Sequence, residues 1–346
     1  AISTLLFNRS PYENVIVMGH VQDKDGIKMS KHKGNVVDPW DVLNKQGADA
    51  IRWFFYVNSA PWVHIRFHDA AVDECQRKFM GTLLNTYSFF VMYAELDEFD
   101  PSKYELEYEK LTVIDKWIIS RLNTLIKTVI GHLDEYHITE AARSLLDFVD
   151  ELSNWYVRRS RERFWRSELN QDKINAYMTL YTVLCELSKV CAPFIPFISE
   201  EIYRNLYQSF HKDAPVSVHL CDFPKVNEKH IDAELEERME IVLKVVNQGR
   251  ACRNAANIKN RQPLSKIYLV SEFDLGEMEK ELIKDELNIH EIIMAGKQNN
   301  FISYKLKPQL RTLGPKYGKL LSKISAVLSE CDANSWVEKL KNNEVI

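Results

Sequence analysis

Residues 154–166 read Asn-Trp-Tyr-Val-Arg-Arg-Ser-Arg-Glu-Arg-Phe-Trp-Arg, and this stretch decides how the rest of the chain is interpreted. It holds five arginines and four aromatic residues. At 100° per residue, Arg159, Arg163 and Arg166 share one face of a helix. Guanidinium groups grip phosphates with two hydrogen bonds, and planar side chains stack on unpaired bases. The pattern therefore predicts a helix that binds an exposed RNA loop.

The same stretch also fits an amphipathic helix whose aromatic side chains are buried and whose arginines pair with acidic neighbours. Arg158 and Glu162 are four residues apart and can pair. Tyr156 and Phe164 are the aromatic residues that we expect in a core rather than in a contact. The candidate RNA contacts are Trp155, Arg158, Arg159, Arg161, Arg163 and Trp165.

Helical periodicity continues on both sides of this stretch. Apolar spacing predicts helices over residues 69–94, 113–134, 139–166, 172–191, 197–210 and 232–257. Long helices joined by modest connections form a bundle. After it, short strands are expected at 266–270, 291–294 and 301–306, with helices at 275–287, 316–330 and 334–342. The expected fold is mainly α, with domains at residues 1–66, 67–225 and 226–346, the last a small α+β unit.

Composition limits the classes of function. The 346 residues carry a formal net charge of -4, which excludes a uniformly basic nucleic-acid binder but leaves room for local basic patches. Six scattered cysteines without a Cys-x-x-Cys pair indicate reduced cytoplasmic thiols and predict no zinc or other metal site. No apolar run approaches the roughly 20 residues of a membrane helix. The chain opens on Ala1 and an apolar stretch, which suggests a piece cut from a longer protein.

A strand, a turn and a basic loop are expected near the start. Residues 14–21 are short and β-branched and predict a buried strand, followed by a hairpin turn at Asp25-Gly26. Residues 28–32 read Lys-Met-Ser-Lys-His. Two lysines three residues apart can converge on a polyphosphate and offset charge on a leaving oxygen. A solvated Lys-rich turn is the alternative. Asp38 and Asp49 are each expected to cap the start of a helix.

The basic loop resembles the signature loop of class I aminoacyl-tRNA synthetases, usually Lys-Met-Ser-Lys-Ser. The motif here is Lys28, Met29, Ser30, Lys31 and His32, and the histidine departs from the usual serine. Residues 34–39 and 47–52 match this family as well. The resemblance implies that Lys31 contacts ATP, accompanied by Mg²⁺, that Lys28 supports it, and that Ser30 adds a hydrogen bond or shapes the loop. The reaction implied is attack of an amino-acid carboxylate on the α-phosphorus, with pyrophosphate leaving.

Residues 154–165 resemble the isoleucyl-tRNA synthetases in particular. Residues 191–203 and 219–224 resemble the later part of the helical bundle that binds the anticodon stem and loop. Residues 249–253, 258–264 and 306–318 resemble the following region, the last of them in the subgroup shared by eukaryotes and some bacteria. The resemblance implies a monomeric cytoplasmic enzyme that binds tRNA(Ile). Further basic candidates, for which a structural or solvated role is the stronger expectation, are Arg250, Arg253, Lys259, Arg261 and Arg311.

The sequence departs from a complete synthetase in two respects. The second signature of the class, His-Ile-Gly-His, is absent, and neither residues 18–20 nor 63–66 match it. No inserted hydrolytic domain is present either. We therefore expect that these residues alone do not form an aminoacyl adenylate. Two alternatives remain: a non-catalytic tRNA-binding module, against which the lysine loop argues, and a valyl or leucyl relative, against which residues 154–165 argue.

Overall fold

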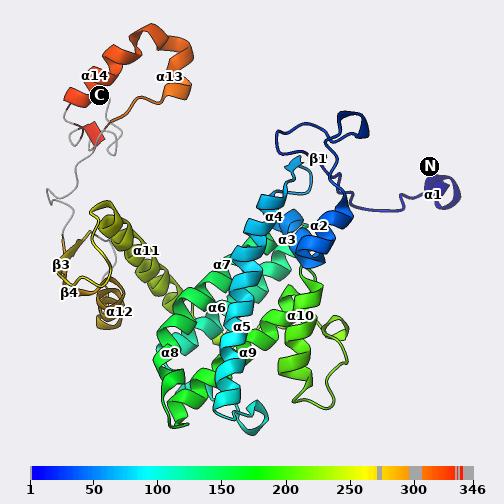
Figure 1. The fold of residues 1–346 in the computed structure, drawn as a ribbon, viewed down its shortest axis with the longest axis vertical. Coiled ribbons are helices and arrows are strands. Elements are labelled where there is room, and N and C mark those ends of the chain that lie inside the picture. The colour runs from blue at the N-terminus through cyan, green and yellow to red at the C-terminus, as the bar shows by residue number, and fades with distance from the viewer. Residues whose placement is uncertain (1, 271–274, 296–305, 332, 334–335, 338–346) are drawn as a thin grey trace. The chain divides into compact units, whose positions relative to one another are not determined.

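The computed structural model describes residues 2–270, 275–295, 306–331, 333 and 336–337 (Figure 1). Two compact units divide the chain, Ala1–Met239 and Glu240–Ile346. The first contains both the basic loop and the bundle, since its helices contact one another across the expected boundary near residue 66.

The first unit is mainly helical. Its named elements are α1 (Ile2–Phe7), β1 (Val21–Gln22), α2 (Pro39–Gln46), α3 (Ala48–Asn58), β2 (Ile65–Arg66), α4 (Asp69–Gln76), α5 (Thr82–Leu96), α6 (Val113–Asp134), α7 (Ile138–Glu151), α8 (Arg158–Trp165), α9 (Gln171–Cys191) and α10 (Pro196–Tyr203). The helix α11 (Ala233–Ala255) begins in this unit and continues into the second. These bounds confirm the helices that periodicity predicted.

Three of the expected helices contain one wider turn. Helical π turns at Arg77–Gly81, Leu152–Val157 and Arg204–Gln208 join α4 to α5, join α7 to α8, and extend α10. Such turns insert a residue into the regular hydrogen-bond ladder and often lie at functional sites. The π turn at Leu152–Val157 leads directly into the arginine-rich helix α8, so the face that α8 presents is rotated relative to α7.

The core of the bundle lies among α5, α6, α7 and α9 (Figure 1). Trp117, Ile118 and Val129 of α6 are buried, as their helical spacing predicts. A capping box fixes the start of α6: the Thr112 hydroxyl accepts from the Asp115 backbone N–H, and the Asp115 carboxylate accepts from Thr112. Fifteen of the 21 residues of α9 are buried, because neighbouring helices pack along its length. The helix α9 is therefore the axis of the unit.

The expected buried strand over residues 14–21 is wrong. Only Val21–Gln22 pair, in parallel, with Ile65–Arg66, while Val17 and Met18 are exposed. A buried strand needs cover on both faces, and no element of the described chain covers these side chains. The hairpin turn is confirmed: Gly26 has φ 81° and its N–H donates to the Asp23 carbonyl.

The second unit is a small α+β arrangement. The strands β3 (Leu264–Leu269) and β4 (Ile289–Met294) pair in parallel and are joined by α12 (Glu277–Leu287). They begin two residues before the predicted strands. The expected helix 316–330 is instead α13 (Leu310–Tyr317) followed by α14 (Leu321–Glu330). The strand expected at 301–306 and the helix expected at 334–342 fall largely outside the described residues.

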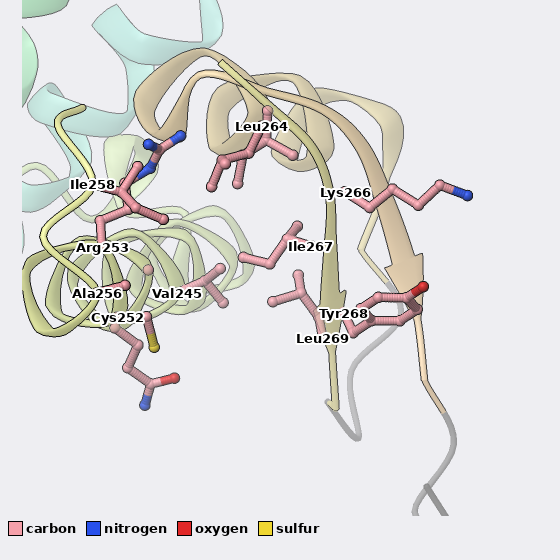
Figure 2. A pocket seen from close by; sticks show the side chains of 13 residues that line it. Val245, Cys252, Arg253, Ala256, Ile258, Leu264, Lys266, Ile267, Tyr268 and Leu269 are labelled. Atoms are coloured by element: carbon pink, nitrogen blue, oxygen red, sulfur yellow. The ribbon is translucent and has the colours of Figure 1, made fainter. Parts of the chain in front are cut away.

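A cavity of about 360 Å³ lies between α11 and β3 in the second unit (Figure 2). Its walls are mainly aliphatic, with Ile258, Leu264 and Ile267 among them, and Cys252 lies on its helical side. At this cavity α11 approaches α12 closely, since a Cβ on Gly249 of α11 would lie 2.4 Å from Cδ1 of Leu287 of α12. Glycine at this position therefore allows α11 to pack on α12.

Candidate functional site

The basic loop is held by a carboxylate–amide clamp at its base. Oδ1 of Asp23 accepts from the backbone N–H groups of Asp25 (3.0 Å) and Ile27 (2.8 Å), and its Oδ2 accepts from Nδ2 of Asn35 (2.7 Å). Oδ1 of Asn35 in turn accepts from the Ser30 backbone N–H at 2.9 Å. Hydrogen bonds from Asn35 and from backbone amides lower the pKa of Asp23. The loop therefore has a defined base.

The two lysines of the loop extend from this base into solvent. Lys28 and Lys31 are exposed, and in the part of the chain that the structure describes neither is ion-paired. Ser30 is half-buried and begins a short 3-10 turn, Lys31–Lys33, that Gly34 ends at φ 64°. His32 is exposed as well. Ammonium groups presented in this way can bind a polyphosphate without first breaking an internal ion pair.

Sequence reasoning missed the clamp residues Asp23 and Asn35. Their signal was present, since Asp23 begins the Asp-Lys-Asp-Gly turn and Asn35 follows the glycine that ends the loop. Both residue types commonly bond nearby backbone groups in turns. Their mutual contact spans twelve residues, so only the folded hairpin brings them together.

Arg163 does not belong to an RNA-binding surface. The residue is 9% exposed, and its guanidinium makes a bidentate pair with Asp115, with Nη1–Oδ1 at 2.8 Å and Nη2–Oδ2 at 2.9 Å. Nη2 also donates to the Asp172 carbonyl at 2.9 Å. Burial lowers the pKa of Arg163, but the hydrogen bonds and charge of Asp115 outweigh burial and raise it overall. The expectation that Arg163 contacts RNA is therefore wrong, because its guanidinium is bound to the buried carboxylate of Asp115.

Trp155 is also inside the bundle, at 3% exposure, and is corrected in the same way. Tyr156 and Phe164 are fully buried, which confirms their assignment to the core. The Tyr156 hydroxyl donates to Oδ1 of Asp115 at 2.8 Å. The inner face of α8 and of its preceding π turn is therefore structural.

The outer face of α8 comprises Arg158, Arg159, Arg161 and Trp165. Arg161 is exposed, Trp165 is 59% exposed, and Arg158 and Arg159 are half-buried. Nε of Arg158 donates to the Asn154 carbonyl at 2.8 Å, and its guanidinium lies 5.9 Å from the centroid of the Trp155 ring. The structure thus brings four of the six predicted RNA contacts onto one short helix, among them the exposed indole of Trp165.

The end of α8 is anchored on the start of α9. Arg166 pairs with Asp172 at 3.0 Å, and Nζ of Lys173 donates to the Arg166 carbonyl at 2.6 Å. Lys173 is 1% exposed and is neutralised by Asp97 at 2.5 Å. A buried ammonium requires such a partner, because an unpaired buried charge is costly. The outer face of α8 is therefore fixed to the bundle axis.

The basic residues of the second unit separate into two groups. Arg253, which rises from α11 in Figure 2, is buried and donates to the carbonyls of Lys259 (3.1 Å) and Gln262 (3.0 Å). Arg250 pairs with Glu286 at 2.5 Å. Both are structural, as expected. Lys259, Arg261 and Arg311 are exposed.

Within the described ranges, no group of three or more His, Cys, Asp or Glu side chains is placed to hold a metal ion. None of the described helices combines the length and the apolar character needed to cross a membrane.

Two family models match the chain. The model for the anticodon-binding domain of tRNA ligases covers residues 115–268, which include α8. The model for class I tRNA synthetases of the I, L, M and V group covers residues 1–68, which include the basic loop.

Curated relatives match over the whole chain. It is 52% identical over 346 residues to the isoleucine–tRNA ligase of Clostridium kluyveri and 53% identical to that of Clostridium novyi, and it covers 33% of each. It is 44% identical over 349 residues to isoleucine–tRNA ligase 2 of Bacillus cereus, and covers 32% of that protein. The chain thus spans about a third of the length of these relatives.

Proposed function

Since the chain is a homologue of the C-terminal third of the isoleucine–tRNA ligases, a family of class I synthetases, we propose that it recognises the anticodon region of tRNA(Ile) through α8 and contributes the lysine loop to ATP-dependent activation of isoleucine. In this role two separate parts of the first unit serve one reaction. The lysine loop binds the nucleotide, and the bundle binds the RNA that accepts the amino acid.

The outer face of α8 is the observation that carries this proposal. It presents the exposed Arg161 and the exposed indole of Trp165, and the half-buried Arg158 and Arg159 belong to the same helix, within the region matched by the anticodon-binding model. Guanidinium groups bind phosphates and an exposed indole stacks on an unpaired base, and an anticodon loop offers both. The inner face is occupied by the core, so RNA meets this helix from one side.

The lysine loop supports the second half of the proposal. When isoleucine attacks the α-phosphorus of ATP, negative charge grows on the departing pyrophosphate. Lys31 offsets that charge, Lys28 supports it from the hairpin, and the half-buried Ser30 shapes the turn. Mg²⁺ accompanies ATP and supplies further positive charge at the phosphates. Because the clamp of Asp23 and Asn35 fixes the base of the loop, the ammonium groups start from a defined position.

The two other functions that the sequence left open are less well supported. A free-standing tRNA-binding module has no use for two exposed lysines on a clamped loop. A valyl or leucyl enzyme is disfavoured because the curated relatives named above are isoleucine–tRNA ligases. We further propose that the parent enzyme is a monomeric cytoplasmic ligase. The resemblance of residues 306–318 supports its membership of the subgroup shared by eukaryotes and some bacteria.

Titration of labelled tRNA(Ile) with the purified chain at several salt concentrations tests the RNA half. Affinity should fall with salt, because phosphate contacts release counterions. Arg161→Ala should weaken binding and lower the salt slope by about one. Arg204→Ala is the matched control, since Arg204 is also exposed but follows α10. Salt-independent binding, or equal loss in both variants, would remove α8 from the interface.

Pyrophosphate exchange by the complete ligase tests the nucleotide half. Lys31→Ala should slow exchange by at least a hundredfold, the order expected when a group that stabilises charge in the transition state is lost. Lys33→Ala is the control, since Lys33 is exposed in the same 3-10 turn but lies outside the motif. An unchanged rate for Lys31→Ala would take the loop out of the reaction.

A further inference from the structure

The helix α3 connects the lysine loop to the bundle, and its first turn is bonded to another helix. Asp49 is 6% exposed, and its carboxylate accepts from the backbone N–H groups of Ile198 (2.8 Å) and Phe197 (3.3 Å). These donors belong to the first turn of α10, where an anion is favoured by the helix dipole. The expectation that Asp49 caps its own helix is therefore wrong. That cap position is Gly47, and Asp49 caps α10.

Arg52 extends the same contact by one turn. Its Nη2 donates to the Pro193 carbonyl at 2.7 Å, and its Nε donates to the Phe194 carbonyl at 3.2 Å. These carbonyls lie in the turn between α9 and α10. Asp49 and Arg52 are three residues apart on one face of α3. The Asp49 carboxylate therefore accepts from backbone N–H groups, and the Arg52 guanidinium donates to backbone carbonyls, at the same α9–α10 turn.

The opposite end of α3 is fastened by α7. Nε and Nη2 of Arg143 donate to the carbonyls of Val57 (3.2 Å) and Asn58 (3.0 Å), and the Thr139 hydroxyl donates to the Ser59 carbonyl at 3.0 Å. The last carbonyls of a helix have no partner within it, and here α7 supplies the donors. Thr139 lies in the first turn of α7, whose N-cap position is His137.

One residue separates α3 from the helix that follows the lysine loop. Gly47 alone joins α2 to α3, and at φ 82° it adopts a conformation that other residues rarely reach. The helix α2 is also held to α4, because Nε2 of Gln46 donates to the Asp69 carbonyl at 3.1 Å. A shift of α3 relative to the bundle would therefore move α2. It would also move the base of the loop, because β1, next to Asp23, pairs with β2 in the segment that follows α3.

The turn that α3 contacts follows the C-terminal end of α9, and the start of α9 holds the end of α8. Twenty-one residues of α9 separate the two, about 31 Å at the usual rise per residue. At its start, Asp172 and Lys173 bind Arg166, and Asp172 also pairs with Arg163 at 2.9 Å. Because most of α9 is buried, its two ends cannot move independently without disrupting the core.

We propose that Asp49 and Arg52 are positioning residues that hold the lysine loop in a fixed place relative to α8, so that RNA bound on α8 restrains the loop through α9. The inference rests on the proposed function for its RNA partner. The attachment of α3 to the α9–α10 turn by Asp49 and Arg52 depends only on the hydrogen bonds given above and not on the proposed function. Neither residue is a reacting group; each acts through the helix that it fastens.

Amide hydrogen exchange of the 346-residue chain without RNA tests this attachment. Asp49→Ala leaves two N–H groups of α10 without their acceptor, and loss of such a cap should speed exchange in residues 28–58 about tenfold. Asp49→Asn, which keeps an oxygen acceptor, should restore most of the protection. Asp41→Ala is the matched control, an exposed carboxylate in α2. Unchanged exchange in Asp49→Ala, or equal acceleration throughout α6 and α9, overturns the positioning role.

Repeating the measurement with saturating tRNA(Ile) tests the restraint. In the unaltered chain, RNA should slow exchange in residues 28–46 at least threefold. Asp49→Ala and Arg52→Gln should bind tRNA within about twofold of the unaltered chain and lose this slowing. If tRNA binds and the loop does not respond, the coupling is wrong. If tRNA does not bind at all, the proposed function fails, and the comparison without RNA still decides the role of Asp49.

Discussion

Arg163→Ala is the substitution that most sharply distinguishes the two faces of α8. The change removes a guanidinium that makes two hydrogen bonds to the fully buried Asp115 and two further contacts to Asp172. Asp115 would keep its bonds from Thr112 and from the Tyr156 hydroxyl but would lose its only counter-charge among the contacts found in the described chain. A buried carboxylate would thus be left without a cation.

The magnitude follows from that uncompensated charge. Breaking a buried ion pair by removing one partner costs about 3–5 kcal/mol of unfolding free energy. A unit of some 240 residues loses about 2–4 °C in melting temperature for each kcal/mol. The variant should therefore melt on the order of 10 °C lower than the unaltered chain. Removal of an exposed side chain such as Arg161 should change stability by no more than about 0.5 kcal/mol.

Urea unfolding followed by far-ultraviolet circular dichroism measures the difference. Arg163→Lys adds a useful comparison, because an ammonium keeps the charge but cannot form the bidentate pair. The free energy of unfolding of this variant should lie between those of the alanine variant and the unaltered chain. A loss below about 1 kcal/mol for Arg163→Ala would refute the reasoning, since it would mean that the Asp115 pair is not a structural centre of the bundle.

Two further predictions concern titratable groups. The folded pKa of Asp23 lies below its ordinary 3.8, so its stabilisation of the loop is fully present above pH 3.8 and is lost as the pH falls through the folded value; in a nuclear magnetic resonance titration, Asn35→Ala should move that pKa upward, and an unchanged value would exclude the clamp. Cys252 is exposed, whereas burial raises the pKa of Cys185 to about 12, so a thiol reagent at pH 8 should label Cys252 at once and Cys185 only on unfolding. Peptide mapping by mass spectrometry distinguishes the two cysteines, and early labelling of Cys185 would contradict its place in the core.

Local signals in the sequence predicted the local structure well. The helix over residues 113–134 has the bounds that its apolar spacing indicated, and Asp38 caps α2 by accepting from the Trp40 N–H. The Asp25-Gly26 turn likewise follows from the residues themselves. Each of these features depends on neighbours within a few positions, so composition and periodicity suffice to find them.

Features that depend on distant partners were not predictable. Periodicity places Arg159 and Arg163 on one side of a helix, but not which of the two meets a carboxylate 48 residues earlier in the chain. Asp49 looks like a cap for its own helix, yet it binds backbone groups 148 and 149 residues away. A carboxylate or guanidinium is compatible with many partners, and only the packing of the bundle selects one.

The error over residues 14–21 has a different origin. A run of β-branched residues favours an extended backbone, but its burial depends on whether other elements pack on its two faces. Within this stretch of the described chain, Val21 pairs with a parallel neighbour, as does Gln22 after it, and residues 15–18 remain exposed.

The central claim, that the outer face of α8 reads the anticodon region, is tested most directly by comparing two RNA hairpins of equal length and charge. One carries the anticodon stem and loop of tRNA(Ile), and the other carries the same stem with an unrelated loop. We predict that the chain binds the first at least tenfold more tightly at physiological salt, and that Trp165→Ala removes most of the difference. Equal affinity for the two hairpins would contradict the account.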